Sequence, residues 1–199
     1  TGGGALATAC VLGWREARQV VDIGPLPALH PVQTRGAAPL ARAWDRLAAR
    51  IAGTELGLNG AAPRSLEERA ELAARIHREV DAEVVQRALR YAATHRSAFM
   101  WPWEEEPRSV ADAILDDETY DWLPLLSGML ESGGFPVVVS ERSLVEAHEL
   151  ARPATGIQPS VSGSAGLAGA RELHAVSLIP HGDRVGILFS GRDWERSLT

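Results

Sequence analysis

A run of glycines near the start of the chain has the composition of a phosphate-binding loop. Thr1-Gly2-Gly3-Gly4-Ala5-Leu6-Ala7 passes directly into an apolar segment that predicts the first turns of a helix. Glycine has no Cβ, so backbone N–H groups can converge on an anion without steric hindrance. The helix adds its unpaired N–H groups and the positive end of its dipole. The sequence therefore predicts a cradle for a phosphate group.

Two other interpretations fit the same residues. A glycine triplet is also typical of a tight turn or a flexible end. In addition, Gly2, Gly4 and Ala7 match the G-x-G-x-x-G/A pattern of dinucleotide-binding domains, and Asp22 lies near the spacing of a ribose-binding carboxylate. No strand precedes Gly2 in the sequence, so this pattern lacks its usual context. A nicotinamide-binding Rossmann domain is an alternative prediction.

Most other catalytic signatures are missing from the sequence. It contains no P-loop, H-E-x-x-H, C-x-x-C or G-x-S-x-G motif. The six histidines lack the spacing of metal ligands, so no metal site is predicted. The acidic clusters at 104–106 and 116–118 are predicted to be solvated loop and helix-cap residues. Trp101 and Trp103 beside the first cluster indicate either a packed loop or a surface for a partner or substrate.

The composition indicates one sizeable globular domain, or most of one. The chain has 199 residues, of which 45% are hydrophobic and 23% charged. A net charge of −6 without a basic stripe argues against nucleic acid or an anionic membrane as partner. The single cysteine, Cys10, indicates a reducing compartment and is predicted to lie in the core. No apolar run has the length of a membrane span or the flanks of a signal peptide, so we expect a cytoplasmic protein.

Hydrophobic periodicity predicts helices separated by short apolar strands. The first helix, 5–19, is expected to bury a face that includes Leu6, Cys10 and Trp14. Ser65 with Glu68 and Ser143 with Glu146 form capping boxes, which predict helices over 66–94 and 144–151. Further helices are predicted over 40–51, 109–115, 119–131 and 163–173, and strands over 29–33, 136–139 and 185–189.

This alternation predicts an α/β domain with a mainly parallel sheet flanked by helices. Ligands of such sheets bind outside the carboxyl ends of the strands. Ser190 directly follows the predicted strand 185–189 and is therefore expected at such an edge, with the glycine loop at another.

Several blocks of sequence occur in the order in which one enzyme family carries them. They are Gly2-Gly3-Gly4-Ala5-Leu6-Ala7, Val32-Gln33-Thr34-Arg35-Gly36-Ala37-Ala38-Pro39, Ser109-Val110-Ala111-Asp112-Ala113-Ile114-Leu115, Gly156-Ile157-Gln158-Pro159-Ser160 with Gly163-Ser164-Ala165-Gly166-Leu167-Ala168-Gly169, and Phe189-Ser190-Gly191-Arg192. In these blocks the chain resembles the pyridoxal-phosphate enzymes of fold type II, the tryptophan synthase β type. The resemblance is to their threonine synthase and serine/threonine dehydratase branch.

The resemblance implies pyridoxal 5′-phosphate as the cofactor. In such enzymes the glycine loop binds the cofactor phosphate, here through the N–H groups around Gly2, Gly3, Gly4 and Ala5. A Ser or Thr after the last strand bonds the pyridine nitrogen, a role that matches Ser190. A hydroxyl in this place leaves the nitrogen largely unprotonated, which suits elimination and replacement on amino acids.

The chain also departs from this family. It contains no lysine, so the Schiff-base lysine is not in this chain, and the Ser/Asn-rich loop for the substrate carboxylate is not found. We therefore expect residues 1–199 to be the C-terminal part of the large cofactor-binding domain, with a helical insertion at about 53–132. Gln158 stands where dehydratase-like relatives often have an acid, which favours threonine-synthase-like chemistry.

The predicted function is a lyase that converts O-phosphohomoserine to threonine, present as a part that is inactive alone. A serine/threonine deaminase is the alternative within the fold. A Rossmann domain and a non-catalytic module built around Trp101 and Trp103 are alternatives from other classes. The substrate would be a small amino acid, and because relatives are commonly dimeric, a homodimer is a possible assembly.

Overall fold

Helices make up most of the secondary structure of this chain. A computed structural model describes residues 1–58 and 62–192. Its elements are, in chain order, α1 (Ala5–Val20), β1 (Val32–Thr34), α2 (Pro39–Glu55), α3 (Leu66–Glu79), α4 (Ala82–Thr94), the 3₁₀ turns η1 (Arg96–Ala98) and η2 (Asp112–Ile114), α5 (Trp122–Ser132), β2 (Val137–Val139), α6 (Glu141–Thr155) and α7 (Ala165–Ala175).

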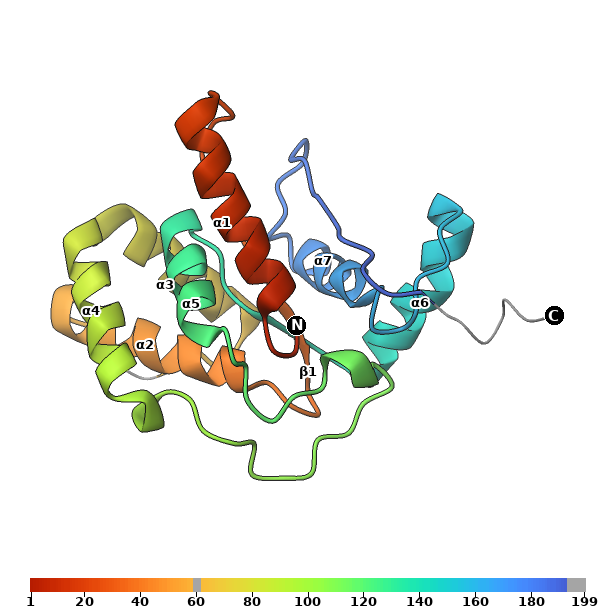
Figure 1. Cartoon of the computed structure of the whole chain (residues 1–199), viewed down its shortest axis with the longest axis horizontal. Coiled ribbons are helices and arrows are strands. Elements are labelled where there is room, and N and C mark those ends of the chain that lie inside the picture. Colours follow the sequence, from red (N-terminus) through yellow and green to blue (C-terminus); the bar gives the residue numbers. More distant parts are fainter. Residues whose placement is uncertain (59–61, 193–199) are drawn as a thin grey trace.

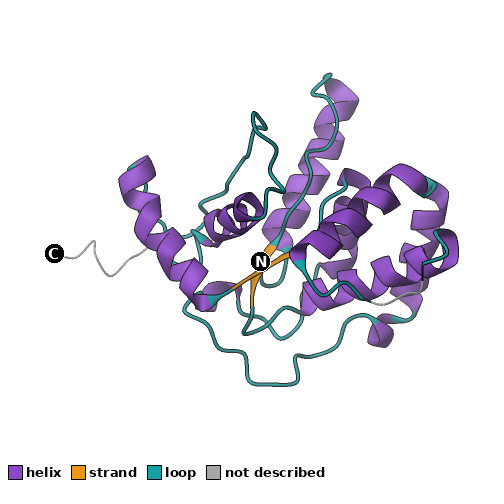
Figure 2. Ribbon diagram, turned by 180° about the vertical axis from the view of Figure 1, so that it is seen from behind, coloured by secondary structure: helices purple, strands orange, loops and turns teal. Residues whose placement is uncertain are grey.

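The two strands pair in parallel in the middle of the molecule. Val32 lies opposite Val137 and Thr34 opposite Val139. The helices α2 to α5 lie on one side of this pair, α6 and α7 lie on the other, and α1 rises between the two groups (Figure 1). Figure 2 shows the strands from behind, between the same two groups. The predicted mixture of helices with a parallel sheet is thus confirmed, with a sheet of two strands within the described residues.

One hydrophobic core joins the sheet to the helices. Trp44 and Leu47 of α2, Ile76 of α3 and Leu126 of α5 are fully or almost fully buried. The same cluster continues through the strands to Leu144 of α6. Such continuous burial is the main source of stability for helices of this length, which are marginal in isolation.

Several helix ends are formed by residues typical of such positions. Pro39 occupies the first turn of α2, where its missing N–H costs no hydrogen bond. The hydroxyl of Ser65 accepts a hydrogen bond from the Glu68 N–H at 3.1 Å and so caps α3. Gly133, with φ 71°, ends α5 in the left-handed conformation that glycine adopts most easily.

The long helix predicted over 66–94 is wrong, because the chain breaks into α3 and α4. Val80 leaves the helical conformation, and Asp81 begins α4 by accepting a hydrogen bond from the Glu83 N–H at 2.9 Å. Aspartate competes for backbone donors in this way, so it favours a cap over a helix interior. The apolar spacing continues across the break, which is why periodicity alone did not detect it.

The second predicted capping box is displaced by three residues. Ser140, not Ser143, caps α6, and its hydroxyl accepts from the Ser143 N–H at 3.1 Å. The helix therefore begins at Glu141 and continues to Thr155, beyond the expected end.

The predicted strand over 185–189 does not form. This segment has no regular secondary structure, and Val185 and Leu188 are 51% and 60% exposed. The sheet of the described residues ends at β1 and β2, so the segment has no neighbouring strand with which to pair. An apolar run satisfies its backbone as a strand only when a partner strand is present.

The face that α1 buries also differs from the prediction. Thr8 and Val11 are its buried residues, whereas Leu6 is 53% exposed and Cys10 is exposed. Val11 packs against Gly128 of α5, where an added Cβ would lie 2.6 Å from a Val11 methyl carbon. The expectation that Cys10 lies in the core is therefore wrong, and the apolar residues around it form an open surface.

The range 53–132, expected to be an insertion, contains α3, α4 and α5, which pack on α2 in the common core. The domain boundaries and the insertion remain predictions. None of the helices in the described part of the chain combines the length and apolarity that crossing a membrane requires.

Candidate functional site

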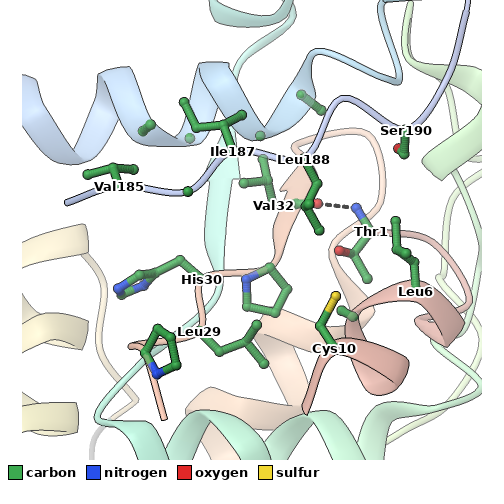
Figure 3. A pocket seen from close by; sticks show the side chains of 18 of the residues that line it. Thr1, Leu6, Cys10, Leu29, His30, Val32, Val185, Ile187, Leu188 and Ser190 are labelled. Atoms are coloured by element: carbon green, nitrogen blue, oxygen red, sulfur yellow. Dashed lines mark hydrogen bonds between the residues drawn. The ribbon is translucent and has the colours of Figure 1, made fainter. Parts of the chain in front are cut away.

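A cavity of about 1050 Å³ separates α1 from α7. The glycine loop and α1 form one wall, and the small residues of α7 form another. The segment 183–188 and Ser190 also line it, and in Figure 3 Val185, Ile187, Leu188 and Ser190 lie along its upper side with Leu29 and His30 below. Most of this lining is apolar, and Asp183 and Arg184 contribute opposite charges within the described residues.

The cavity brings together all five residues predicted to bind the cofactor. Gly2, Gly3, Gly4 and Ala5 line it from the start of α1, and Ser190 lines it from the far end of the described chain. In Figure 3, Ser190 lies at the same end of the cavity as Thr1 and Leu6. Residues separated by almost the whole sequence therefore face one space.

The glycine loop is anchored through its carbonyl groups. The Gly3 carbonyl accepts from the Asp121 N–H at 2.8 Å, and the Thr1 carbonyl accepts from the Gln33 side-chain amide at 3.2 Å. The Thr1 amino nitrogen donates to the Val32 carbonyl (Figure 3). These bonds fix the loop against β1 and the start of α5.

The N–H groups of this loop have no such partners. From Gly2 to Ala7, no N–H donates to an acceptor among the described residues, and the first bond of α1 runs from the Thr8 N–H to the Gly4 carbonyl at 2.9 Å. Gly2 and Gly4 are nevertheless buried. These N–H groups have no acceptor within the described residues, so an anion in the cavity would supply the hydrogen-bond acceptors that the loop lacks.

Two positions of the loop favour glycine. Gly4 has φ 101°, which strains any residue with a Cβ. A Cβ on Gly2 would collide with the carboxylate of Asp116. Asp116, expected to be a solvated cap residue, thus lies against the loop, where its charge opposes the approach of an anion.

The segment that carries Ser190 is held at its end by the turn before α7. The Ser160 N–H donates to the Gly191 carbonyl at 2.9 Å, and Pro159 forms an isolated bridge with Arg192. Gly163 packs so closely on Gly191 that an added Cβ would lie 2.5 Å from its carbonyl oxygen. The Ser190 hydroxyl itself is exposed and has no hydrogen-bond partner within the described residues.

His30 is a cavity residue that sequence reasoning missed. Its Nδ1 lies 3.1 Å from the Phe135 carbonyl oxygen, which can only accept, so Nδ1 carries the proton in the neutral ring. Burial lowers the pKa of His30, and the bond to the Phe135 carbonyl raises it in part. No spacing pattern marked this histidine, because its partners come from a distant loop.

The residues of the rival interpretations lie elsewhere. Asp22 follows the C-terminal end of α1, and 16 helical residues place it about 24 Å along the helix from the glycine loop. It does not line the cavity, and its carboxylate accepts from the nearby Gly24 N–H at 3.3 Å. The geometry therefore does not bring the predicted ribose-binding acid to the glycines.

The Trp101 and Trp103 loop packs on α2. The Arg42 guanidinium lies 3.7 Å from the ring centre of Trp101 and 5.0 Å from that of Trp103. Its Nη1 also donates to both carboxylate oxygens of Glu104 at 2.9 Å. These contacts favour the packed-loop interpretation, because the rings are already used by a cation of the same chain.

No group of three His, Cys, Asp or Glu side chains in the described part of the chain is arranged to hold a metal ion. No known protein-family model matches the sequence, and no curated protein is significantly similar to it.

Proposed function

We propose that this chain forms the pyridoxal-phosphate-binding part of a lyase that acts on amino acids, in the manner of threonine synthase. The observation that carries the proposal is the shared cavity: Gly2, Gly3, Gly4, Ala5 and Ser190 line one space of about 1050 Å³. A phosphorylated pyridine needs an anion site and a ring-nitrogen partner in one enclosure, and the cavity contains candidates for both.

The residues present fit such a group. The N–H groups of the glycine loop, which have no acceptor within the described residues, suit a phosphate, whose oxygens accept several hydrogen bonds at once. The Ser190 hydroxyl is free to donate to a pyridine nitrogen. The apolar lining from α1 and α7 suits an aromatic ring.

The roles of this chain in the reaction follow from those contacts. The glycine loop would hold the phosphate and fix the position of the ring, and Ser190 would keep the pyridine nitrogen unprotonated. When bound, the group supplies an electron sink for bond cleavage at the substrate Cα. The chain contains no lysine, so the amine that binds the cofactor covalently must come from outside these 199 residues.

The charge of the lining bears on the choice of substrate. O-phosphohomoserine carries a phosphate and a carboxylate, both of which favour cationic partners. Arg184 is the one arginine among the described lining residues, and Asp183 beside it opposes it. This observation favours the serine/threonine deaminase as a second candidate, because its substrates carry no phosphate.

The proposal is tested by binding of pyridoxine 5′-phosphate to the 199-residue chain. This probe keeps the phosphate and the ring nitrogen but lacks the aldehyde, so it cannot react with an amine. Calorimetry should give a larger dissociation constant for pyridoxine, which lacks the phosphate. Inorganic phosphate should compete with pyridoxine 5′-phosphate for binding. Trp14 lines the cavity, so its fluorescence should be quenched in the same titration, and this quenching should disappear in Trp14→Phe.

Three variants connect binding to the proposed residues. Ser190→Asp should raise the pKa of the bound pyridine nitrogen, read from the absorption of the bound probe against pH, whereas Ser97→Ala, outside the cavity, should not. Asp116→Asn should strengthen phosphate binding by removing a charge beside Gly2.

Equal affinity for the two pyridoxine forms would overturn the proposal. Binding of a nicotinamide dinucleotide in their place would support the Rossmann alternative. Binding of none of these compounds would support the non-catalytic module.

A further inference from the structure

Gln33 is a buried amide at the centre of β1 whose bonds connect three parts of the chain. The residue is 1% exposed. Oε1 accepts from the Ala41 N–H of α2 at 3.0 Å. Nε2 donates to the Thr1 carbonyl at 3.2 Å and to the Thr119 hydroxyl at 3.3 Å. A buried amide with each polar atom bonded is held in one orientation.

The bond to the Thr1 carbonyl also determines where the next N–H points. In a planar trans peptide the C=O and the following N–H point in opposite directions. Because the Thr1 carbonyl faces Gln33, the Gly2 N–H faces away from Gln33. The same geometry applies one step later, where the Gly3 carbonyl accepts from the Asp121 N–H at 2.8 Å and the Gly4 N–H points the other way.

The two hydrogen bonds to the loop carbonyls differ in whether a side-chain substitution can remove them. The Asp121 anchor is a backbone N–H, which side-chain substitution leaves in place. The Thr1 carbonyl, in contrast, is held by the side chain of Gln33, which a substitution can remove. The glycines that follow have no Cβ to restrict their own backbone conformation. The Thr1 amino nitrogen is held by the Val32 carbonyl, and the Gln33 amide is the group that holds the Thr1 carbonyl and with it the plane of the Thr1–Gly2 peptide.

We infer that Gln33 is a positioning residue that orients the Gly2 N–H toward a phosphate bound in the cavity. The inference rests on the proposed function, because it gives the glycine loop an anion to bind. Gln33 does not itself line the cavity and acts only through the Thr1 carbonyl.

The test uses the affinity ratio of pyridoxine 5′-phosphate to pyridoxine. Gln33→Glu keeps the volume and an acceptor for Ala41 but replaces the donor that faces the Thr1 carbonyl. Gln33→Met removes the donor without adding a charge. We expect the ratio to fall about tenfold in both variants, the loss typical of one hydrogen bond to a charged group.

Two control variants separate positioning from general damage. Thr119→Val removes the other acceptor of the Gln33 amide but keeps the bond to Thr1, so the ratio should hold. Gln86→Met changes an exposed glutamine on α4 and should alter neither affinity. If Gln33→Met weakens both ligands equally, Gln33 is merely structural and the inference is overturned.

A measurement on the unaltered chain covers the case in which the Gln33 variants do not fold. Titration with inorganic phosphate, followed by amide NMR, should shift the Gly2 N–H and the Gln33 side-chain NH₂ together. Glycine shifts with an unmoved Gln33 signal would overturn the inference but leave the proposed function. A wild-type chain that binds both pyridoxine forms equally would overturn the proposed function itself.

Discussion

Replacing Gly4 by alanine tests whether the glycine loop is constrained as its geometry indicates. Gly4 has φ 101° and precedes α1. An added Cβ would lie 2.9 Å from Leu125 Cδ1, 3.1 Å from Asp121 Cβ and 3.3 Å from Thr119 Cγ2. Leu125 and Thr119 are fully buried, so neither has open space into which to move.

The expected cost has two parts. A positive φ costs a residue with a Cβ about 1–2 kcal/mol. Crowding an extra methyl group into packed surroundings adds about 1–3 kcal/mol. We therefore expect Gly4→Ala to lower the free energy of unfolding by about 2–5 kcal/mol.

Gly13 provides a matched control within the same helix. An added Cβ there meets no atom within 4 Å, and its φ is not positive. Gly13→Ala should raise the free energy of unfolding by about 0.5–1 kcal/mol, because alanine favours a helix interior over glycine.

Urea unfolding followed by circular dichroism measures both variants. With a slope of about 1–3 kcal/mol per molar urea, the two midpoints should differ by about 1 M or more. A folded Gly4→Ala chain should also lose its preference for pyridoxine 5′-phosphate, which Gly13→Ala should keep. Coincident midpoints, or a Gly4→Ala midpoint above that of the wild type, would refute the reasoning.

Two further predictions concern groups that the fold buries. Burial lowers the pKa of His30 in the folded state below its unfolded-state value of 6.5. The fold therefore has its full stability above pH 6.5 and loses stability as the pH falls from there through the folded-state pKa, because the unfolded chain takes up the proton first. Unfolding free energy measured against pH should therefore decline less steeply in acid for His30→Gln than for wild type, and parallel curves would contradict this. Arg69 donates to both carboxylate oxygens of Asp45 at 2.7 Å, with side chains 15% and 13% exposed. Arg69→Met should cost about 1–3 kcal/mol by leaving the carboxylate unpaired, and adding Asp45→Leu should recover part of that loss in a double-mutant cycle; a further loss in the double variant would refute it.

The local features of this fold could be predicted because each depends on a few neighbouring residues. Pro39, Ser65 and Gly133 act through bonds or dihedral angles within one helical turn. The strand 137–139 could likewise be predicted from its continuous run of valines. The break at Asp81 is also local, but two competing signals coincided there, and the apolar spacing hid the cap.

The residues of the candidate site also fall into those that the sequence marks and those that only the tertiary structure identifies. The glycine loop and Ser190 stand out in the sequence because their residue types and their flanks suit a phosphate and a ring nitrogen. Nothing local marks His30 or Gln33, since the first is defined by Phe135 and the second by Thr1, Ala41 and Thr119.

The sequence by itself determined where α1 begins, where glycine is needed and that no lysine is available to a cofactor. Tertiary structure alone decided which face of α1 is buried, since Val11 packs against Gly128 from a helix more than a hundred residues away. It also decided that the apolar run 185–189 would form no strand and that its residues 185–188 would line a cavity. Helix starts depend on bonds between near neighbours, whereas burial and strand pairing depend on surfaces that distant segments supply.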